Sequence, residues 1–211
     1  MSTEPYSRGQ LVSLAKLTPE DMAEIDQRRQ SYTRLGFAYQ LAFVRLFNRF
    51  PAQVSFEAID ELLTFVSVQL DISADVIQDY TTRQQTISEH QEQIRLYLKL
   101  QRFGESETLQ LNQFLFDEAC RLEQTSALLS KAEQFLKDHD ILCPAQDTLL
   151  RLIVRQREQA KQHIYTRIRE ALSQESQRKM DKLVEVDDSR LSPLQALKDV
   201  PKRASPQAVL R

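Results

Sequence analysis

Glycine occurs only three times in this chain of 211 residues, and that scarcity limits the possible folds more than any other feature. Sheet proteins need frequent tight turns, many of which require glycine, and they favour β-branched and aromatic residues. This chain is instead rich in leucine, glutamine, glutamate, arginine and alanine, which are good helix formers. Hydrophobic residues make up 41% of it, which is enough for a buried core. We therefore expect an all-α protein.

Helix-start and helix-stop signals divide the chain into successive helices. The clearest start is at Thr18, a capping residue followed by a proline and two acidic residues, and this helix should end near 28–30. The other expected helices are 33–47, 55–70, 73–80, 83–100, 108–123, 126–138 and 147–172. The helix at 33–47 is apolar on too many sides for a surface helix, so it should form the centre of the first core.

Gly104 marks an expected boundary, because glycine commonly ends a helix and the residues after it can start another. The expected organisation is a helical bundle of helix-turn-helix type at 1–103, a second such bundle at 104–185 and a polar tail at 186–211. Within the tail, Ser192 precedes one proline and Ser205 precedes another, so both are possible helix caps. We expect this tail to be a linker and the start of a following region in a longer protein.

Charge is unevenly distributed, although the net charge is only −2. Residues 55–80 carry six acidic side chains and no Lys or Arg, whereas residues 81–103 carry four basic and two acidic ones. Residues 104–143 carry eight acidic and three basic side chains, and residues 144–180 carry eight basic and four acidic ones. This alternation suits basic helices that face a polyanion, although a bundle with internally balanced charges shows it too.

Residues 73–100 carry the pattern most relevant to function: a short helix, a tight junction at Thr81 and Thr82, and a longer helix. The longer helix has apolar residues spaced to anchor one side, which leaves Arg, Gln and Ser on the other. Arg bonds the edge of guanine and Gln that of adenine, so this side suits a DNA major groove. Glu89 and Glu92 count against it, since they repel phosphate, and a solvated Gln-rich surface is the alternative.

A second basic helix is expected at 147–172. Arg155, Gln162 and Arg169 recur at seven-residue spacing, and Arg151 lies one turn before Arg155. This helix is either a second DNA-facing helix or a packing helix with a solvated basic side.

Catalytic chemistry finds no support in the sequence. The three histidines are isolated, no Gly-rich phosphate loop is present, and no nucleophile with its base can be assembled from the spacing. Cys120 and Cys143 are too few and too far apart for a zinc motif, so we expect reduced core thiols, no metal and no cofactor. The absence of a transmembrane-length run or a signal peptide predicts a cytoplasmic binding module.

Several segments resemble one protein family in their order and spacing. They are LTPED at 17–21, the arginine pair at 28–29, RLGFAYQL at 34–41, RQQT at 83–86 after Tyr80, the stretch 90–95, LCPAQDTLLRLI at 142–153 and LSPL at 191–194. Together they resemble the N-terminal region of the Tn-three family of replicative bacterial transposases. The resemblance implies tandem helical DNA-binding domains that recognise the terminal inverted repeats of a transposon, in a bacterial protein associated with the nucleoid.

The resemblance also implies that the acidic catalytic triad of these transposases lies beyond this chain, which would then bind DNA without cutting it. The residues that match the family pattern and are candidates for DNA contact are Arg28, Arg29, Arg34, Arg83, Gln84, Gln85, Thr86, His90, Arg95, Thr148, Arg151 and Arg155. The residue types and helix positions add Thr82, Ser88, Gln91, Gln162 and Arg169.

The leading hypothesis is sequence-specific binding to duplex DNA at transposon ends, with the remainder of a transposase as partner and no membrane contact. The alternative is a helical assembly module that self-associates through the apolar side of 37–47 or through the helix at 147–172. An enzyme ranks third, because no residues are available for the chemistry.

Overall fold

The computed structural model describes residues 8–53, 56–121, 124–185 and 192–198. The chain divides into two compact units, Met1–Arg157 and Glu158–Arg211. Within the described ranges the regular elements are helices, together with one isolated bridge between Gln101 and Ile141. The predicted all-α class is confirmed. None of these helices combines the length and apolar character that crossing a membrane requires.

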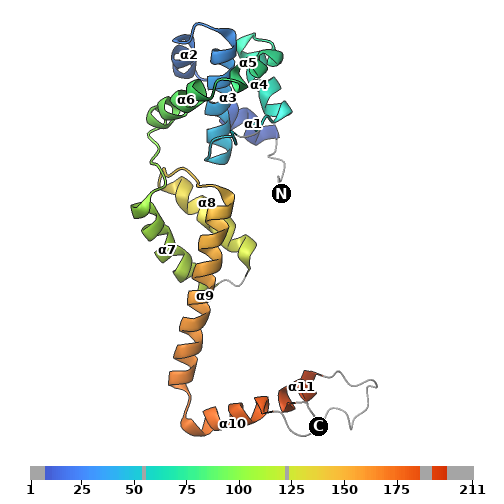
Figure 1. Cartoon of the computed structure of the whole chain (residues 1–211), viewed down its shortest axis with the longest axis vertical. Helices are drawn as coiled ribbons and strands as arrows, with labels where there is room; N and C mark the ends of the chain where they lie inside the picture. Colours follow the sequence, from blue (N-terminus) through green and yellow to red (C-terminus); the bar gives the residue numbers. More distant parts are fainter. Residues whose placement is uncertain (1–7, 54–55, 122–123, 186–191, 199–211) are drawn as a thin grey trace, which may run out of the picture. The chain divides into compact units, whose positions relative to one another are not determined.

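The helices of each unit can be followed in Figure 1. The first unit contains α1 (Arg8–Ala15), α2 (Pro19–Asp26), α3 (Ser31–Phe47), α4 (Asp60–Leu70), the 3-10 helix η1 (Ala74–Val76), α5 (Ile77–Thr81), α6 (Gln84–Tyr97), α7 (Glu105–Ala119), α8 (Thr125–Asp138) and the first half of α9 (Gln146–Ala171). The second unit contains the rest of α9, α10 (Gln174–Val184) and α11 (Pro193–Lys198).

A capping box starts α2, as the sequence predicts. The Thr18 hydroxyl accepts a hydrogen bond from the backbone N–H of Asp21 at 3.2 Å, and the Asp21 carboxylate accepts one from the Thr18 N–H at 2.8 Å. Pro19 occupies the first helical position, where an N–H has no partner within the helix. These contacts set the direction in which α2 leaves the preceding loop.

The central helix of the first core is α3, and this prediction is confirmed. All residues from 35 to 44 are buried, and α1, α2, α4, α5 and α6 pack on α3, which Figure 1 shows in their midst. The chain therefore covers the apolar side of 37–47 with its own helices, so that side is a core surface and not an exposed seam.

A second core lies among α7, α8 and the first half of α9. It is tied to the first core by Asn48, which follows α3 in a left-handed backbone conformation with φ of 51°. The Asn48 amide donates to the Ile141 carbonyl at 2.8 Å, and the Asn48 carbonyl accepts from the Cys143 N–H at 2.8 Å. Both thiols, Cys120 and Cys143, are free and half-buried, and burial raises the pKa of Cys143 to about 11.

The change from the first core to the second falls between Leu100 and Phe103, whereas the compact units divide after Arg157. The division into 1–103, 104–185 and 186–211 stays a proposal. Residues 186–191 and 199–211, which include the Ser205 cap, lie outside the described residues.

Two helix boundaries correct the sequence prediction. The fourth helix begins at Asp60, whereas the predicted start at Ser55 lies outside the described residues. Gly104 does not end the preceding helix, which stops at Tyr97, but is the N-cap residue of α7, where its N–H donates to the Glu107 carboxylate at 3.0 Å. The left-handed residue after α6 is Lys99, with φ of 57°. The short helices α1 and α10 were not predicted from the sequence.

Candidate nucleic-acid interface

A helix-turn-helix arrangement is formed by η1 and α5, the turn at Thr82 and Arg83, and α6. The Arg83 N–H donates to the Tyr80 carbonyl at 3.0 Å, and the Arg83 carbonyl accepts the first hydrogen bond of α6, from Ile87 at 3.0 Å. Ile87 and Ile94 are buried, as predicted, and anchor α6 to the first core. The order of elements predicted for 73–100 is therefore confirmed.

A buried polar network fixes the angle between these two helices. Tyr80 accepts a hydrogen bond from the Gln40 amide of α3 and bonds through its hydroxyl to Nδ1 of His90 at 2.9 Å. The ring of His90 stacks on Tyr80 and meets the edge of Phe37 at 5.3 Å between ring centroids. A β-carbon on Gly36 would overlap the Tyr80 ring, so glycine is required at this crossing of α3 and α5.

His90 thus lies in the core, only 5% exposed. Burial, with a smaller contribution from the charge of Arg28, lowers its pKa to about 4, so the ring is neutral at pH 7. The neutral imidazole of His90 therefore packs α6 onto α3 and α5 and is not exposed for contact with DNA. The Tyr80 pKa is raised by the same burial.

Arg28, Arg34 and Arg95 are held by contacts within the chain. The guanidinium of Arg28 lies over the Phe37 ring at 3.4 Å from its centroid and donates to the Gln93 side chain at 2.5 Å. Arg34 pairs with Asp26 at 2.5 Å. These contacts leave the two guanidinium groups fewer free donors than an unpaired arginine offers to phosphate.

Arg95 donates twice to Glu92, at 2.7 and 2.9 Å, and once to the Leu100 carbonyl at 2.8 Å. Hydrogen bonds from Arg95 and then Arg102 lower the Glu92 pKa to about 2, so this carboxylate is ionised and neutralised by its partners. Of the two glutamates that count against this helix, Glu92 is thereby compensated by cations of the chain, whereas the Glu89 carboxylate accepts a hydrogen bond from the neutral Gln85 amide.

Five further candidates of this module lie at its surface. Thr82, Arg83, Gln84, Gln85 and Ser88 are all exposed, at the turn and along the first turns of α6, and we call them the α6 polar face. The Gln85 amide donates to Glu89 at 2.9 Å, and Arg83 lies 5.2 Å from the centroid of the Tyr32 ring. These polar groups can donate to and accept from the edges of bases.

Other predicted residues flank the α6 polar face. Arg29 is exposed and has no partner within the described residues. Thr86 is half-buried, and so is Gln91, which accepts a hydrogen bond from Gln53 at 3.0 Å.

The first half of α9 presents a second set of polar side chains. Leu149 and Ile153 face the second core, whereas Arg151 and Arg155 are exposed. Arg151 donates to the Thr148 hydroxyl at 3.2 Å, and Arg155 has no partner among the described residues.

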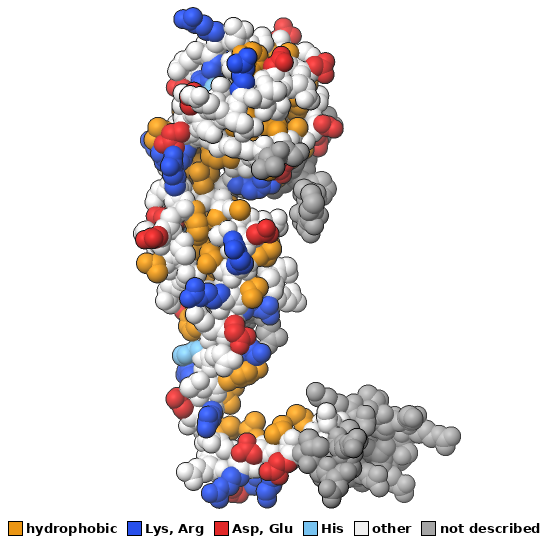
Figure 2. Space-filling view, in the orientation of Figure 1, with side chains coloured by type: hydrophobic (Ala, Val, Ile, Leu, Met, Phe, Trp, Pro, Cys, Tyr) orange, Lys and Arg blue, Asp and Glu red, His pale blue; other side chains and the backbone are white. Residues whose placement is uncertain are grey.

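Two further candidates on α9, Gln162 and Arg169, belong to the second unit. The Gln162 amide donates to Glu158 at 2.8 Å, and Arg169 lines a pocket between α9 and α10. On the face drawn in Figure 2, Lys and Arg side chains are interspersed with Asp and Glu. Among its described residues, that face therefore carries no broad basic surface.

The residues that hold this site in place are not evident from the sequence. Asp21 is fully buried and bonds Arg45 and Tyr97, so it joins α2 to α3 and α6. The capping pattern at Thr18 identified Asp21 as a cap, but its distant partners had no signal in the sequence. Gly36 was likewise visible only as an unexplained glycine within a helix.

Comparison with known proteins extends over most of the chain. Residues 3–156 match the model of a family described as a domain of unknown function, DUF4158. The chain is 30% identical over 91% of its length to the transposase for transposon gamma-delta of Escherichia coli strain K12. It is 26% identical over 90% of its length to the transposase for transposon Tn1546 of Enterococcus faecium. The resemblance to Tn-three family transposases is confirmed, and the chain spans about a fifth of the length of these relatives.

Proposed function

This chain belongs to the DUF4158 family, and from that premise we propose that it is the part of a transposase that recognises transposon ends. It acts in transposition by binding the terminal inverted repeats in duplex DNA, and it contributes recognition, not strand cleavage. Its relatives carry the name transposase and are about five times as long. Its partners are therefore the DNA ends and the remainder of the transposase.

The observation that carries this proposal is the α6 polar face. It combines an arginine, two glutamines and two hydroxyl side chains on the start of a helix that follows a tight turn. Recognition helices place the residues of their first turns against base edges. The buried contacts of Tyr80 and His90 hold this helix rigidly on the core, as base readout requires.

The proposal gives separate roles to the α6 polar face and to the arginines of α9. Gln85 keeps one amide hydrogen on Glu89, which orients the amide so that its oxygen and second hydrogen can bond adenine. Arg83 can reach guanine or an adjacent phosphate. Arg151 and Arg155 on α9 bind phosphate and secure the chain along the duplex, without reading its sequence.

A direct test measures binding of the full chain to labelled duplexes by fluorescence anisotropy. One duplex carries the terminal inverted repeat of the parent transposon, and the other carries the same bases in shuffled order. The repeat should bind tighter by a factor of about 10³ or more at physiological salt. Equal affinity for the two duplexes would refute the proposal.

Within this test, Gln85→Ala should reduce the preference for the repeat by about 1–3 kcal/mol, because one pair of base contacts is lost. Gln110→Ala is the matched control, since Gln110 is an exposed glutamine on α7, outside the α6 polar face. It should leave the preference unchanged. If both variants behave alike, α6 is not the helix that reads the bases.

A further inference from the structure

The second unit exposes a series of apolar side chains on two consecutive helices. On α9, Tyr165 is 54% and Ile168 is 49% exposed, and on α10, Met180 is 51% and Val184 is 57% exposed. Hydrophobic side chains are visible along α10 in Figure 2. No residue of α10 is buried, and a helix of 11 residues is marginal in water unless its apolar side is covered. The short helix α11 packs on α10, yet these four side chains remain about half exposed and form an apolar surface that a partner can cover.

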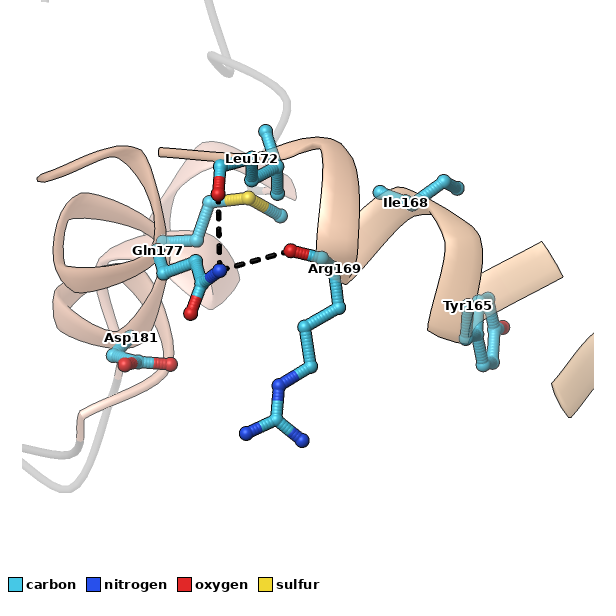
Figure 3. A pocket seen from close by; sticks show the side chains of 7 residues that line it. Tyr165, Ile168, Arg169, Leu172, Gln177 and Asp181 are labelled. Atoms are coloured by element: carbon cyan, nitrogen blue, oxygen red, sulfur yellow. Dashed lines mark hydrogen bonds between the residues drawn. The ribbon is translucent and has the colours of Figure 1, made fainter. Parts of the chain in front are cut away.

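The corner between the two helices is well built. The Gln177 amide donates to the carbonyls of Arg169 and Leu172 at 2.8 and 3.1 Å, so it satisfies the free end of α9 (Figure 3). Ser173 caps the start of α10 through the N–H of Ser176 at 3.2 Å. The apolar surface is thus held in one shape.

A pocket of about 320 Å³ lies in this corner. It is lined by Tyr165, Ile168 and Arg169 from α9, by Leu172 directly after α9, and by Gln177, Met180 and Asp181 from α10. The first four lie at positions i, i+3, i+4 and i+7, and the three on α10 lie at i, i+3 and i+4, so each set is on one side of its helix. The lining is mainly apolar, with one cation and one anion among its side chains.

Arg169 and Asp181 make this surface self-complementary. Both side chains are exposed and line the same pocket, yet no ion pair joins them in the part of the chain that the structure describes. In a dimer with two-fold symmetry, the same surface meets itself, so each residue i contacts residue j of the partner and each j contacts i. With Arg169 on α9 and Asp181 on α10, such a dimer forms two equivalent ion pairs, one from each copy to the other.

We propose that the end of α9 and α10 form a homodimer interface, in which Arg169 of one copy faces Asp181 of the other across the apolar side chains. A second copy fits this surface better than a nucleic acid does, because exposed Tyr, Ile, Met and Val side chains gain from an apolar partner and Asp181 repels phosphate. The apolar contacts supply the affinity, and the two charge pairs set the register. Arg169, a candidate for DNA contact by its place in the sequence, faces the partner copy in this interface. The α6 polar face, Arg151 and Arg155 take no part in it.

The test is sedimentation velocity of the full chain without DNA, at concentrations from roughly 1 to roughly 200 µM, the range in which weak association is seen. The sedimentation coefficient should rise from that of a monomer to that of a dimer. Arg169→Asp and Asp181→Arg should each weaken the dimer at least about tenfold, because like charges then meet twice in the interface. The variant with both changes should regain dimerisation.

A second pair of variants tests the apolar contacts. Met180→Ser should weaken the dimer, whereas Leu109→Ser, a matched change at a 71% exposed residue of α7, should leave it unchanged. Circular dichroism of each variant serves as the control that its helical content is unchanged. A wild-type chain that stays monomeric, or a double charge variant that dimerises no better than the single ones, overturns the proposal.

Discussion

Asp21 shows what a single residue contributes to this protein. Its fully buried carboxylate accepts hydrogen bonds from Arg45, from the hydroxyl of Tyr97 and from the Thr18 N–H. Burial alone would raise the Asp21 pKa, but these three donors outweigh it and lower the pKa to about 2. Because the folded-state pKa is below the unfolded value of about 3.9, ionised Asp21 stabilises the fold above pH 4.

We predict that Asp21→Asn lowers the free energy of unfolding by at least about 2 kcal/mol at pH 7, since Arg45 and Tyr97 lose a charged partner. The difference between wild type and variant should shrink as the pH falls from about 4 to about 2, where the wild-type carboxyl becomes protonated. Urea denaturation across this pH range measures it.

Asp26→Asn is the control for this prediction, because Asp26 is more than half exposed in its pair with Arg34. An exposed ion pair contributes at most about 1 kcal/mol, so this variant should remain close to wild type. If the difference in unfolding free energy between wild type and Asp21→Asn did not change with pH, these contacts would not lower the pKa of Asp21.

At the scale of elements, the orientation of α6 depends on how closely α5 approaches α3. Gly36 permits this approach, because any side chain there would overlap Tyr80, whose hydroxyl supports His90 of α6. Alanine is otherwise the better helix former by about 1 kcal/mol.

We predict that Gly36→Ala nevertheless destabilises the protein by about 1–3 kcal/mol, because the ring of Tyr80 must move within a packed core. It should also weaken binding to the inverted repeat under conditions where the variant is still folded. Gly104→Ala is the matched control. Its β-carbon would meet only the flexible end of Glu107, so the loss should stay below about 1 kcal/mol. A Gly36→Ala variant as stable as wild type would show that α5 and α6 have room to shift.

At the scale of the whole molecule, the net charge of −2 provides no general attraction to DNA. Binding must therefore rely on the few cations that are placed for it, and each phosphate contact releases a counterion. We predict that Arg151→Ala and Arg155→Ala each weaken binding to every duplex, and that each lowers the slope of log K against log salt concentration by about 1.

Affinity titrations at several salt concentrations measure that slope for both duplexes. Gln85→Ala should change the sequence preference but not the slope, because it contacts bases. If the slope is unaffected by either arginine substitution, α9 does not contact the phosphate backbone.

Much of the fold follows from local sequence signals. The scarcity of glycine predicted the all-α class, the capping residue Thr18 predicted the start of α2, and apolar spacing predicted the central position of α3. Capping and helical periodicity act between residues a few positions apart, so a single sequence contains them. The start of α4 and the role of Gly104 were predicted wrongly, because several residue types compete for the same end position of a helix.

The availability of each candidate side chain was decided by tertiary structure. The sequence placed Arg28, Arg95 and Arg83 in one set, yet Arg28 lies on a phenylalanine and bonds α6, and Arg95 is paired, while Arg83 stays at the surface. Likewise the sequence made His90 a candidate for DNA contact, but in the fold its side chain is buried in the core. The sequence determines which residues share a helix face, since that depends on spacing alone. Which of them remain free for a partner depends on contacts between residues far apart in the chain, such as Arg28 with Gln93, and only the packed structure contains those.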